Sequence, residues 1–153
     1  MKGSSAVEFA LTLTIFIILV IGIIEFGRYY FVQHTLQYAT REGMRLALVG
    51  RTINNASGTP MSREDSIITT IRNNATLAVK PASSVTVSIY PVSASFTDPA
   101  GWETQQDAGD PGQYMRVRSR YNYKFFTPLI GGFFSGGGIV IQAEGTYRNE
   151  LFE

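Results

Sequence analysis

The sequence contains no cysteine and only one histidine, His34. The lack of cysteine excludes disulfides, thiolate metal ligands and cysteine nucleophiles. The isolated histidine is accompanied by no serine elbow and no recognisable pair of catalytic carboxylates, so it supports neither catalysis nor a metal site. We therefore expect that the protein is not an enzyme and that it has no cofactor.

A large net charge is also lacking, because 13 basic residues nearly balance 12 acidic ones in the 153-residue chain. This balance does not indicate a nucleic-acid partner. The glycine-rich segment 127–140 lacks the Gly-Lys-Ser/Thr ending of a phosphate-binding loop, so no small-molecule substrate is indicated either. Within this segment, Phe133 and Phe134 could pack on the domain, contact lipid or meet another subunit.

A nearly continuous apolar run extends from Phe9 to Ile24, with Glu8 and Glu25 at its two ends. Residues 6–26 supply the roughly 20 positions that an apolar helix needs to cross a hydrocarbon core. No small-residue cleavage site for a signal peptidase follows the run. The sequence therefore predicts a membrane-spanning helix that is retained in the protein.

A carboxylate at the start of such a helix, as at Glu8, is costly in lipid unless it is neutralised, solvated or paired. Glu8 lies five residues after Gly3, behind a short Met1-Lys2 segment. This pattern resembles the class III signal of type IV pilins and pseudopilins. The resemblance implies that a prepilin peptidase removes residues 1–3 by cutting between Gly3 and Ser4. It also implies that the freed amino group of Ser4 pairs with Glu8 of a neighbouring subunit.

Later motifs narrow this resemblance. They are Glu25-Phe26-Gly27-Arg28, the segment 39–45 with Arg41, Glu42, Gly43 and Arg45, and Tyr147-Arg148-Asn149-Glu150. In combination they look like the TadE-like pseudopilins of tight-adherence (Flp) pilus systems, to which TadF-like members are closely similar. The chain is longer than the shaft-forming pilins of that family, and Phe9 stands where those pilins have tyrosine.

The resemblance therefore implies a minor pseudopilin that takes part in assembly or priming of a tight-adherence pilus through packing of its N-terminal helix. The implied partners are the membrane, other pilin or pseudopilin subunits, the prepilin peptidase and the pilus assembly platform. The implied location is the bacterial inner membrane, with the C-terminal domain extracytoplasmic, or the surface pilus itself. The alternative is an unprocessed single-pass protein whose anchored extracytoplasmic domain is a binding or adhesion module.

Charges beside the apolar run bear on its orientation and on its outer end. Arg28, Arg41 and Arg45 outnumber Lys2, which under the positive-inside rule favours the opposite orientation. We follow the processing signal instead. Since Arg28 lies one helical turn after Glu25, we expect an ion pair between them at the membrane exit.

The helix is expected to continue beyond the membrane. Apolar or small residues recur three and four positions apart, which is the helical period, at Val32, Leu36, Ala39, Gly43 and Leu46. The continuation should end near Gly50, because glycine favours helix C-termini. We therefore predict a transmembrane half over residues 4–27 and an extramembrane half over residues 28–49.

Residues 50–153 are expected to form a small globular domain. Ser62 is a candidate N-cap of a second helix that ends by Pro81. Strands are predicted over residues 85–90, 114–126 and 139–148. The fold class is therefore α+β, with the long pilin-like helix packed on a second helix and on an antiparallel sheet of about three strands that has one covered face.

Two charged groups in this domain are candidate binding features. The second strand carries an outer row of cations, at Arg116, Arg118, Arg120 and Lys124. Such a row could be solvated, could pair with acids such as Glu144, or could form a partner surface. The loop before that strand carries acids at Asp98, Glu103, Asp107 and Asp110, which could bind calcium or remain a solvated loop.

Overall fold

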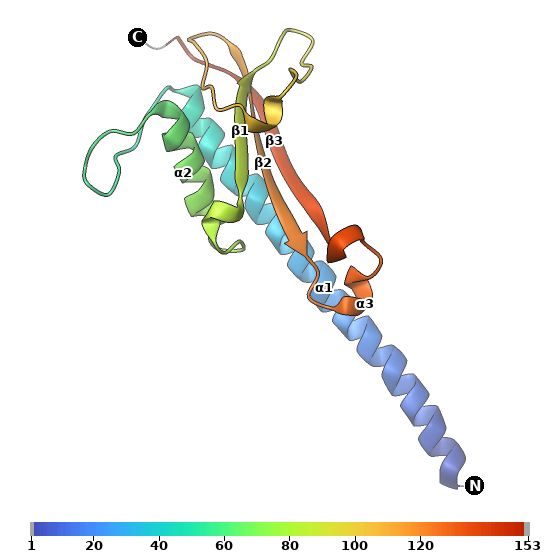
Figure 1. Cartoon of the computed structure of the whole chain (residues 1–153). Helices are drawn as coiled ribbons and strands as arrows, with labels where there is room; N and C mark the ends of the chain where they lie inside the picture. Colours follow the sequence, from blue (N-terminus) through green and yellow to red (C-terminus); the bar gives the residue numbers. More distant parts are fainter. Residues whose placement is uncertain (1, 152–153) are drawn as a thin grey trace. The chain divides into compact units, whose positions relative to one another are not determined.

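The computed structural model describes residues 2–151, and their side chains from Ser5 onward. The helices and strands in chain order are α1 (Lys2–Leu48), α2 (Arg63–Ala75), β1 (Thr86–Pro91), β2 (Tyr114–Lys124), α3 (Pro128–Gly131) and β3 (Gly138–Arg148) (Figure 1). Short 3-10 helices are η1 (Ala82–Ser84), η2 (Trp102–Thr104) and η3 (Ser135–Gly137). The strands form an antiparallel sheet in the order β1-β2-β3, so the predicted α+β class is confirmed.

The chain folds as two compact units. Met1–Phe31 and Tyr123–Ile139 form one of them, which we call the N-terminal unit. Val32–Asn122 and Val140–Glu153 form the other, which we call the sheet unit. Helix α1 and strands β2 and β3 each contribute residues to both units.

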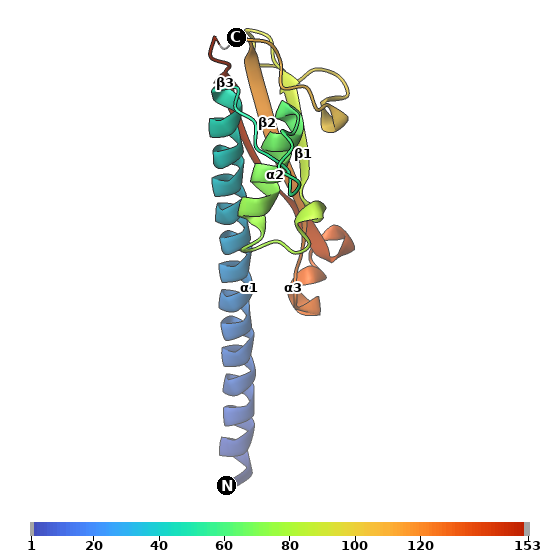
Figure 2. The same ribbon diagram turned by 90° about the vertical axis from the view of Figure 1, so that its left-hand side faces the viewer.

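In the sheet unit, α2 and the second half of α1 lie on the same side of the sheet (Figure 2). The buried residues of this half of α1 follow the helical period and include Val32, Leu36, Ala39, Gly43 and Ala47. The predicted stripe is therefore confirmed, except that Ala47 takes the inward position expected for Leu46, which is half-buried. A buried hydrogen bond of 3.0 Å, from Thr40 Oγ1 to Ser119 Oγ, joins α1 to β2.

The expectation of one solvated sheet face is wrong for part of the sheet. Ser88 and Tyr90 point away from the helices, yet both are fully buried. The loop around η2 covers them, because the Ser88 hydroxyl donates to the carbonyl oxygen of Glu103 at 2.7 Å. The ring of Trp102 also lies 5.6 Å from that of Tyr90, measured between centroids. The long polar loop thus folds back onto the sheet.

Helix α2 begins after Ser62, whose hydroxyl oxygen accepts a backbone N–H of the first turn at 3.0 Å, as expected for an N-cap. The helix ends at Ala75, earlier than the expected limit at Pro81. The Thr76 hydroxyl donates to the carbonyl oxygen of Asn73 at 2.6 Å. This local bond occupies a carbonyl of the last turn, which favours termination there.

The C-terminal Tyr-Arg-Asn-Glu motif fixes the end of β3 to the loop before β2. Asn149 is buried, and its amide nitrogen donates to the carbonyl oxygens of Ala108 at 3.0 Å and Asp110 at 2.9 Å. Arg148 Nε donates to the carbonyl oxygen of Gly112 at 2.8 Å. These bonds satisfy backbone groups of an irregular loop, so the motif has a structural role within the sheet unit.

Candidate functional site

The first half of α1 exposes an almost entirely apolar surface. Among the described residues, α1 is the one helix long and apolar enough to cross a membrane. Large side chains are exposed around its circumference, among them Phe9, Phe16, Leu19, Ile23 and Ile24. A helix that is apolar on all sides is normally buried in a protein core or a membrane. This surface therefore requires lipid or other helices around it.

The polar residues in this stretch are compatible with an apolar surrounding. The hydroxyl of Thr12 donates to the carbonyl oxygen of Glu8 at 2.9 Å, and that of Thr14 donates to the carbonyl oxygen of Ala10 at 2.8 Å. Such bonds satisfy the hydroxyls within the helix. The Glu8 side chain lies on the exposed surface.

The predicted processing and pairing residues Gly3 and Ser4 lie in the first turn of the described helix. The side chain of Ser4 lies outside the described part of the chain. The cut between them and the pairing of Ser4 with Glu8 stay predictions. The structure adds that Glu8 and the predicted new N-terminus belong to one continuous helix.

The Glu25 side chain accepts four hydrogen bonds within the described part of the N-terminal unit. Its Oε1 accepts the backbone N–H of Phe126 at 2.8 Å and the hydroxyl of Tyr123 at 3.1 Å. Its Oε2 accepts the backbone N–H of Thr127 at 3.1 Å and the Thr127 hydroxyl at 3.3 Å. Only 2% of Glu25 is exposed. We call Glu25, Tyr123, Phe126 and Thr127 the Glu25 clamp.

The other residues of the Glu25 motif surround this clamp. Arg28 Nη1 lies 3.9 Å from Glu25 Oε1, so the expected ion pair is present, but it is long and Arg28 is half exposed. The Arg28 guanidinium also lies 5.2 Å from the centre of the Tyr123 ring. Phe26 is exposed, and the Cα of Gly27 faces open space.

The principal partners of Glu25 differ from the predicted one. The sequence singles out this acid because it ends an apolar run, and it predicts the arginine one turn away as the partner. Phe126 and Thr127 act through their backbone N–H groups, about a hundred positions later in the chain. Backbone donors leave no side-chain pattern, so no spacing could have revealed this contact.

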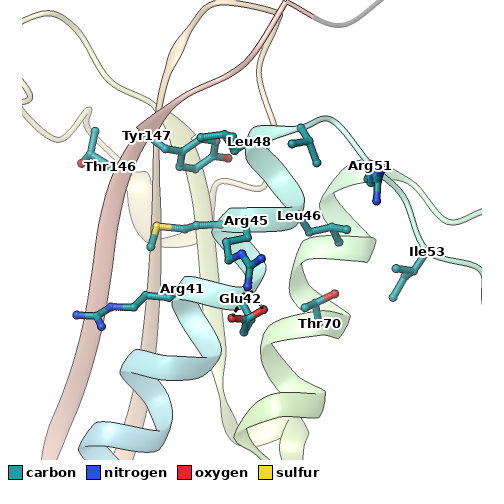
Figure 3. Close-up of a pocket in the computed structure, with 12 residues that line it drawn as sticks. Arg41, Glu42, Arg45, Leu46, Leu48, Arg51, Ile53, Thr70, Thr146 and Tyr147 are labelled. Atoms are coloured by element: carbon teal, nitrogen blue, oxygen red, sulfur yellow. Dashed lines mark hydrogen bonds and ion pairs between the residues drawn. The ribbon is translucent and has the colours of Figure 1, made fainter.

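The second family motif lies at the other end of α1, beside a shallow pocket of about 950 Å³ in the sheet unit (Figure 3). Arg45 and Glu42 point toward each other, and Arg45 Nη1 lies 3.3 Å from Glu42 Oε1. Arg41 points instead toward β3. The ring of Tyr147, which comes from β3, forms part of the wall. The pocket thus brings the second and third motifs together.

Gly43 has a packing role within this motif. A Cβ atom at this position would overlap Cγ1 of Ile71 and would lie 2.8 Å from its Cδ1. Both helices of the sheet unit therefore approach closely at Gly43 because it has no side chain. Ile71 is itself fully buried.

Two of the four predicted cations on β2 are held by ion pairs within the sheet unit. Arg118 contacts Glu144 Oε2 through Nε at 2.6 Å and Asp98 Oδ2 through Nη1 at 2.9 Å. Arg116 Nη1 contacts Asp98 Oδ1 at 2.5 Å. Pairing with Glu144, one of the alternatives considered, is confirmed for Arg118. The sequence did not indicate the pairing with Asp98.

The Asp98 carboxylate is the centre of this network. Burial by itself raises the pKa of Asp98, but hydrogen bonds from Tyr90, Arg118 and Arg116 outweigh it and hold the pKa below the usual value. Burial and the bond to Asp98 raise the pKa of Tyr90 to about 12, so this phenol remains a donor at physiological pH.

Arg120 and Lys124 differ from their two neighbours. Arg120 donates to the carbonyl oxygen of Glu103 at 3.0 Å, and its guanidinium lies 4.7 Å from the ring centre of Trp102. Arg118 stacks on the same ring at 4.1 Å. Lys124 is exposed in the N-terminal unit. The four cations therefore differ in their contacts, and a partner surface that uses all four of them stays a prediction.

The described structure does not bring the carboxylates of the acidic loop together into a metal site. Within residues 2–151, no group of three or more His, Cys, Asp and Glu side chains is placed to hold a metal ion. Asp98 is bound by two guanidinium groups, and Asp107 accepts the backbone N–H of Gly109 at 2.8 Å. The exposed His34 stands on α1 in the sheet unit.

Comparison with known proteins supports the resemblance over the first part of the chain. Residues 3–45 match the family model described as TadE-like protein. The match includes the helix, the Glu25 motif and the motif at Gly43, and it stops before the C-terminal motif. No curated protein and no solved structure matches the chain. The TadE-like match indicates involvement in a Tad pilus system.

Proposed function

From the TadE-like character of residues 3–45, we propose that this protein is a minor pseudopilin of a tight-adherence pilus. In this proposal a prepilin peptidase cuts between Gly3 and Ser4, and the mature chain takes part in assembly or priming of the pilus. The chain is anchored in the bacterial inner membrane, its C-terminal part is extracytoplasmic, and it has no catalytic role.

The single observation that carries the proposal is the division of α1 by burial. Between Val7 and Ile24 the large apolar side chains of α1 are mostly exposed, whereas residues after Phe31 contribute to the core of the sheet unit. A simple membrane anchor needs only the exposed apolar side chains. In a pilus subunit, the helix that enters the membrane is also part of the folded domain, so that the domain moves with the helix.

The proposed assembly contact pairs a new cation with Glu8. Cleavage frees the α-amino group of Ser4, which is four residues from Glu8 in the same chain. A carboxylate in lipid is costly, and a charge-assisted hydrogen bond from a neighbouring subunit offsets part of that cost. Pairing between subunits therefore favours one register of helix packing.

The test is the processing of a Gly3→Leu variant in a host that supplies the prepilin peptidase. We expect the variant to keep its full-length mass on a blot, and the wild-type protein to begin at Ser4 by N-terminal mass spectrometry. Gly27→Leu, in the same helix and facing open space, is the matched control and should be cut normally. Normal cutting of Gly3→Leu would reject the assigned cut site, and a wild-type protein that keeps its full-length mass would favour the unprocessed membrane-anchored binding module.

A further inference from the structure

The segment that carries the Glu25 clamp has an exposed apolar surface that the proposed function does not use. Phe126 and Phe133 are each 82% exposed, and Leu129 is 56% exposed. The sequence from Phe125 to Ala143 contains no charged residue. A loop of this kind is unusual on a water-exposed surface, where large exposed apolar patches mark contact sites.

The loop that carries this surface is held in place by its own hydrogen bonds and by ring packing. Within the loop, the N–H of Gly131 donates to the carbonyl oxygen of Thr127 at 2.9 Å, and that of Phe134 donates to Gly131 at 3.0 Å. Phe134 stacks on Phe125 with ring centres 4.5 Å apart, which resolves one of the alternatives considered for Phe134. Phe133 stays exposed.

The Glu25 clamp sets the position of the loop along the helix. Because Glu25 binds the N–H groups of Phe126 and Thr127, the loop starts at the level where the apolar run ends. A cavity of about 300 Å³ in the same unit is lined by Phe126 together with Ile21 and Ile24. Phe126 thus shares a cavity with Ile21, which lies about one helical turn before Glu25 in the apolar run.

The residues around the Glu25 clamp are of the kinds found at a membrane interface. Arg28 and Lys124 are exposed cations near the clamp, and Tyr29 and Tyr30 are adjacent aromatic residues. Basic and aromatic side chains gather at the headgroup level of membrane proteins, with apolar groups just below them. Phe126 of the loop and Ile24 of the helix are also both exposed, and they line the same cavity.

We propose that residues 126–134 form a second membrane contact, in which Phe126, Leu129 and Phe133 enter the lipid interface beside the spanning helix. Glu25 is the positioning residue, and Lys124 faces lipid headgroups. This inference rests on the membrane anchoring in the proposed function, but not on cleavage at Gly3. It makes the loop a lipid contact that fixes the depth and rotation of α1.

The test uses the full chain in liposomes at low protein density. Because the chain has no native cysteine, one spin label can be placed by Phe133→Cys, with Leu129→Cys as a second site. Ile15→Cys reports the middle of the apolar run, and Ser57→Cys reports an exposed loop of the sheet unit. Collisions with oxygen, which concentrates in lipid, are compared with collisions with a water-soluble nickel chelate.

We expect nickel accessibility at 133 and 129 to be several-fold lower than at 57 and to lie between the values at 57 and 15, because the loop enters the interface and not the bilayer centre. Water-like values at 133 and 129, with a lipid-like value at 15, overturn the loop contact and leave the anchoring intact. A water-like value at 15 overturns the anchoring itself. Low accessibility to both reagents at 133 would identify a contact between subunits and would also overturn the lipid proposal.

A second variant tests the positioning role of Glu25. In the Glu25→Ala background, we expect nickel accessibility at 133 to rise several-fold, while the label at 15 keeps its value. Glu42→Ala, which removes another acid of the same helix, is the control and should change neither label. An unchanged value at 133 in Glu25→Ala shows that the clamp does not position the loop.

Discussion

Glu25 accepts the backbone N–H of Phe126 at 2.8 Å, although the two residues lie 101 positions apart in the chain. This bond ties the end of the apolar run to the loop after β2. A buried carboxylate must be hydrogen-bonded to be tolerated, and two of the four donors to Glu25 are backbone N–H groups of that loop. The helix and the loop therefore stabilise each other at this contact.

The first prediction concerns loss of this carboxylate. Glu25→Ala should speed hydrogen exchange at the amides of Phe126 and Thr127 by about tenfold or more, because hydrogen bonds to charged groups are worth roughly 1.5–3 kcal/mol. Hydrogen exchange of the detergent-solubilised chain, followed by mass spectrometry, measures the effect. Glu42→Ala removes only an exposed pair with Arg45 and should leave those amides unchanged. Equal exchange in Glu25→Ala and wild type would contradict the clamp.

Only contacts that leave a pattern in the amino-acid sequence could be predicted from it. The position of α1 could be predicted because its apolar residues are continuous in one half and periodic in the other. The pairing of Arg118 with Glu144 could be considered because both lie on predicted neighbouring strands. Asp98 lies in an irregular loop, so its contact with Arg118 depends on how that loop folds back, which no local pattern encodes.

A second prediction concerns the close approach of α1 and α2. Gly43→Ala should lower the thermal midpoint by several degrees, since overpacking costs roughly 1–3 kcal/mol and outweighs the better helix propensity of alanine, about 1 kcal/mol. Gly27→Ala meets no atom within 4 Å and should not lower the midpoint. If Gly43→Ala is as stable as Gly27→Ala, the two helices are not closely packed there.

A third prediction compares two buried tyrosine hydroxyls. The Tyr147 hydroxyl has no hydrogen-bond partner within the described part of the chain, and burial raises its pKa to about 12. Tyr147→Phe should therefore be neutral or should stabilise the protein by up to about 1 kcal/mol. Tyr123→Phe removes a donor to the Glu25 carboxylate and should destabilise by roughly 1.5–3 kcal/mol. Thermal unfolding of both variants in one detergent provides the comparison, and a larger loss for Tyr147→Phe would refute it.

A fourth prediction concerns the pH dependence of the Asp98 network. The pKa of Asp98 is lowered in the folded state, because hydrogen bonds from Tyr90, Arg118 and Arg116 outweigh the cost of burial. In the unfolded state the pKa of Asp98 is about 3.9. The stabilisation that the charged Asp98 contributes is therefore fully present above about pH 3.9, and it is lost as the pH falls through the lower pKa of the folded state. Asp98→Asn should therefore be less stable than wild type at pH 7, and the difference should shrink below about pH 4.

The fluorescence of Trp102 can report this unfolding, because it is the single tryptophan and its ring stacks on Arg118 at 4.1 Å. Denaturant titrations of wild type and Asp98→Asn at a series of pH values give the difference directly. Asp110→Asn changes an exposed acid that has no ion pair among residues 2–151, and it serves as the control. Because protonation removes the charge that Arg118 and Arg116 bind, a difference between wild type and Asp98→Asn that stays constant down to pH 2 would show that this charge does not stabilise the sheet.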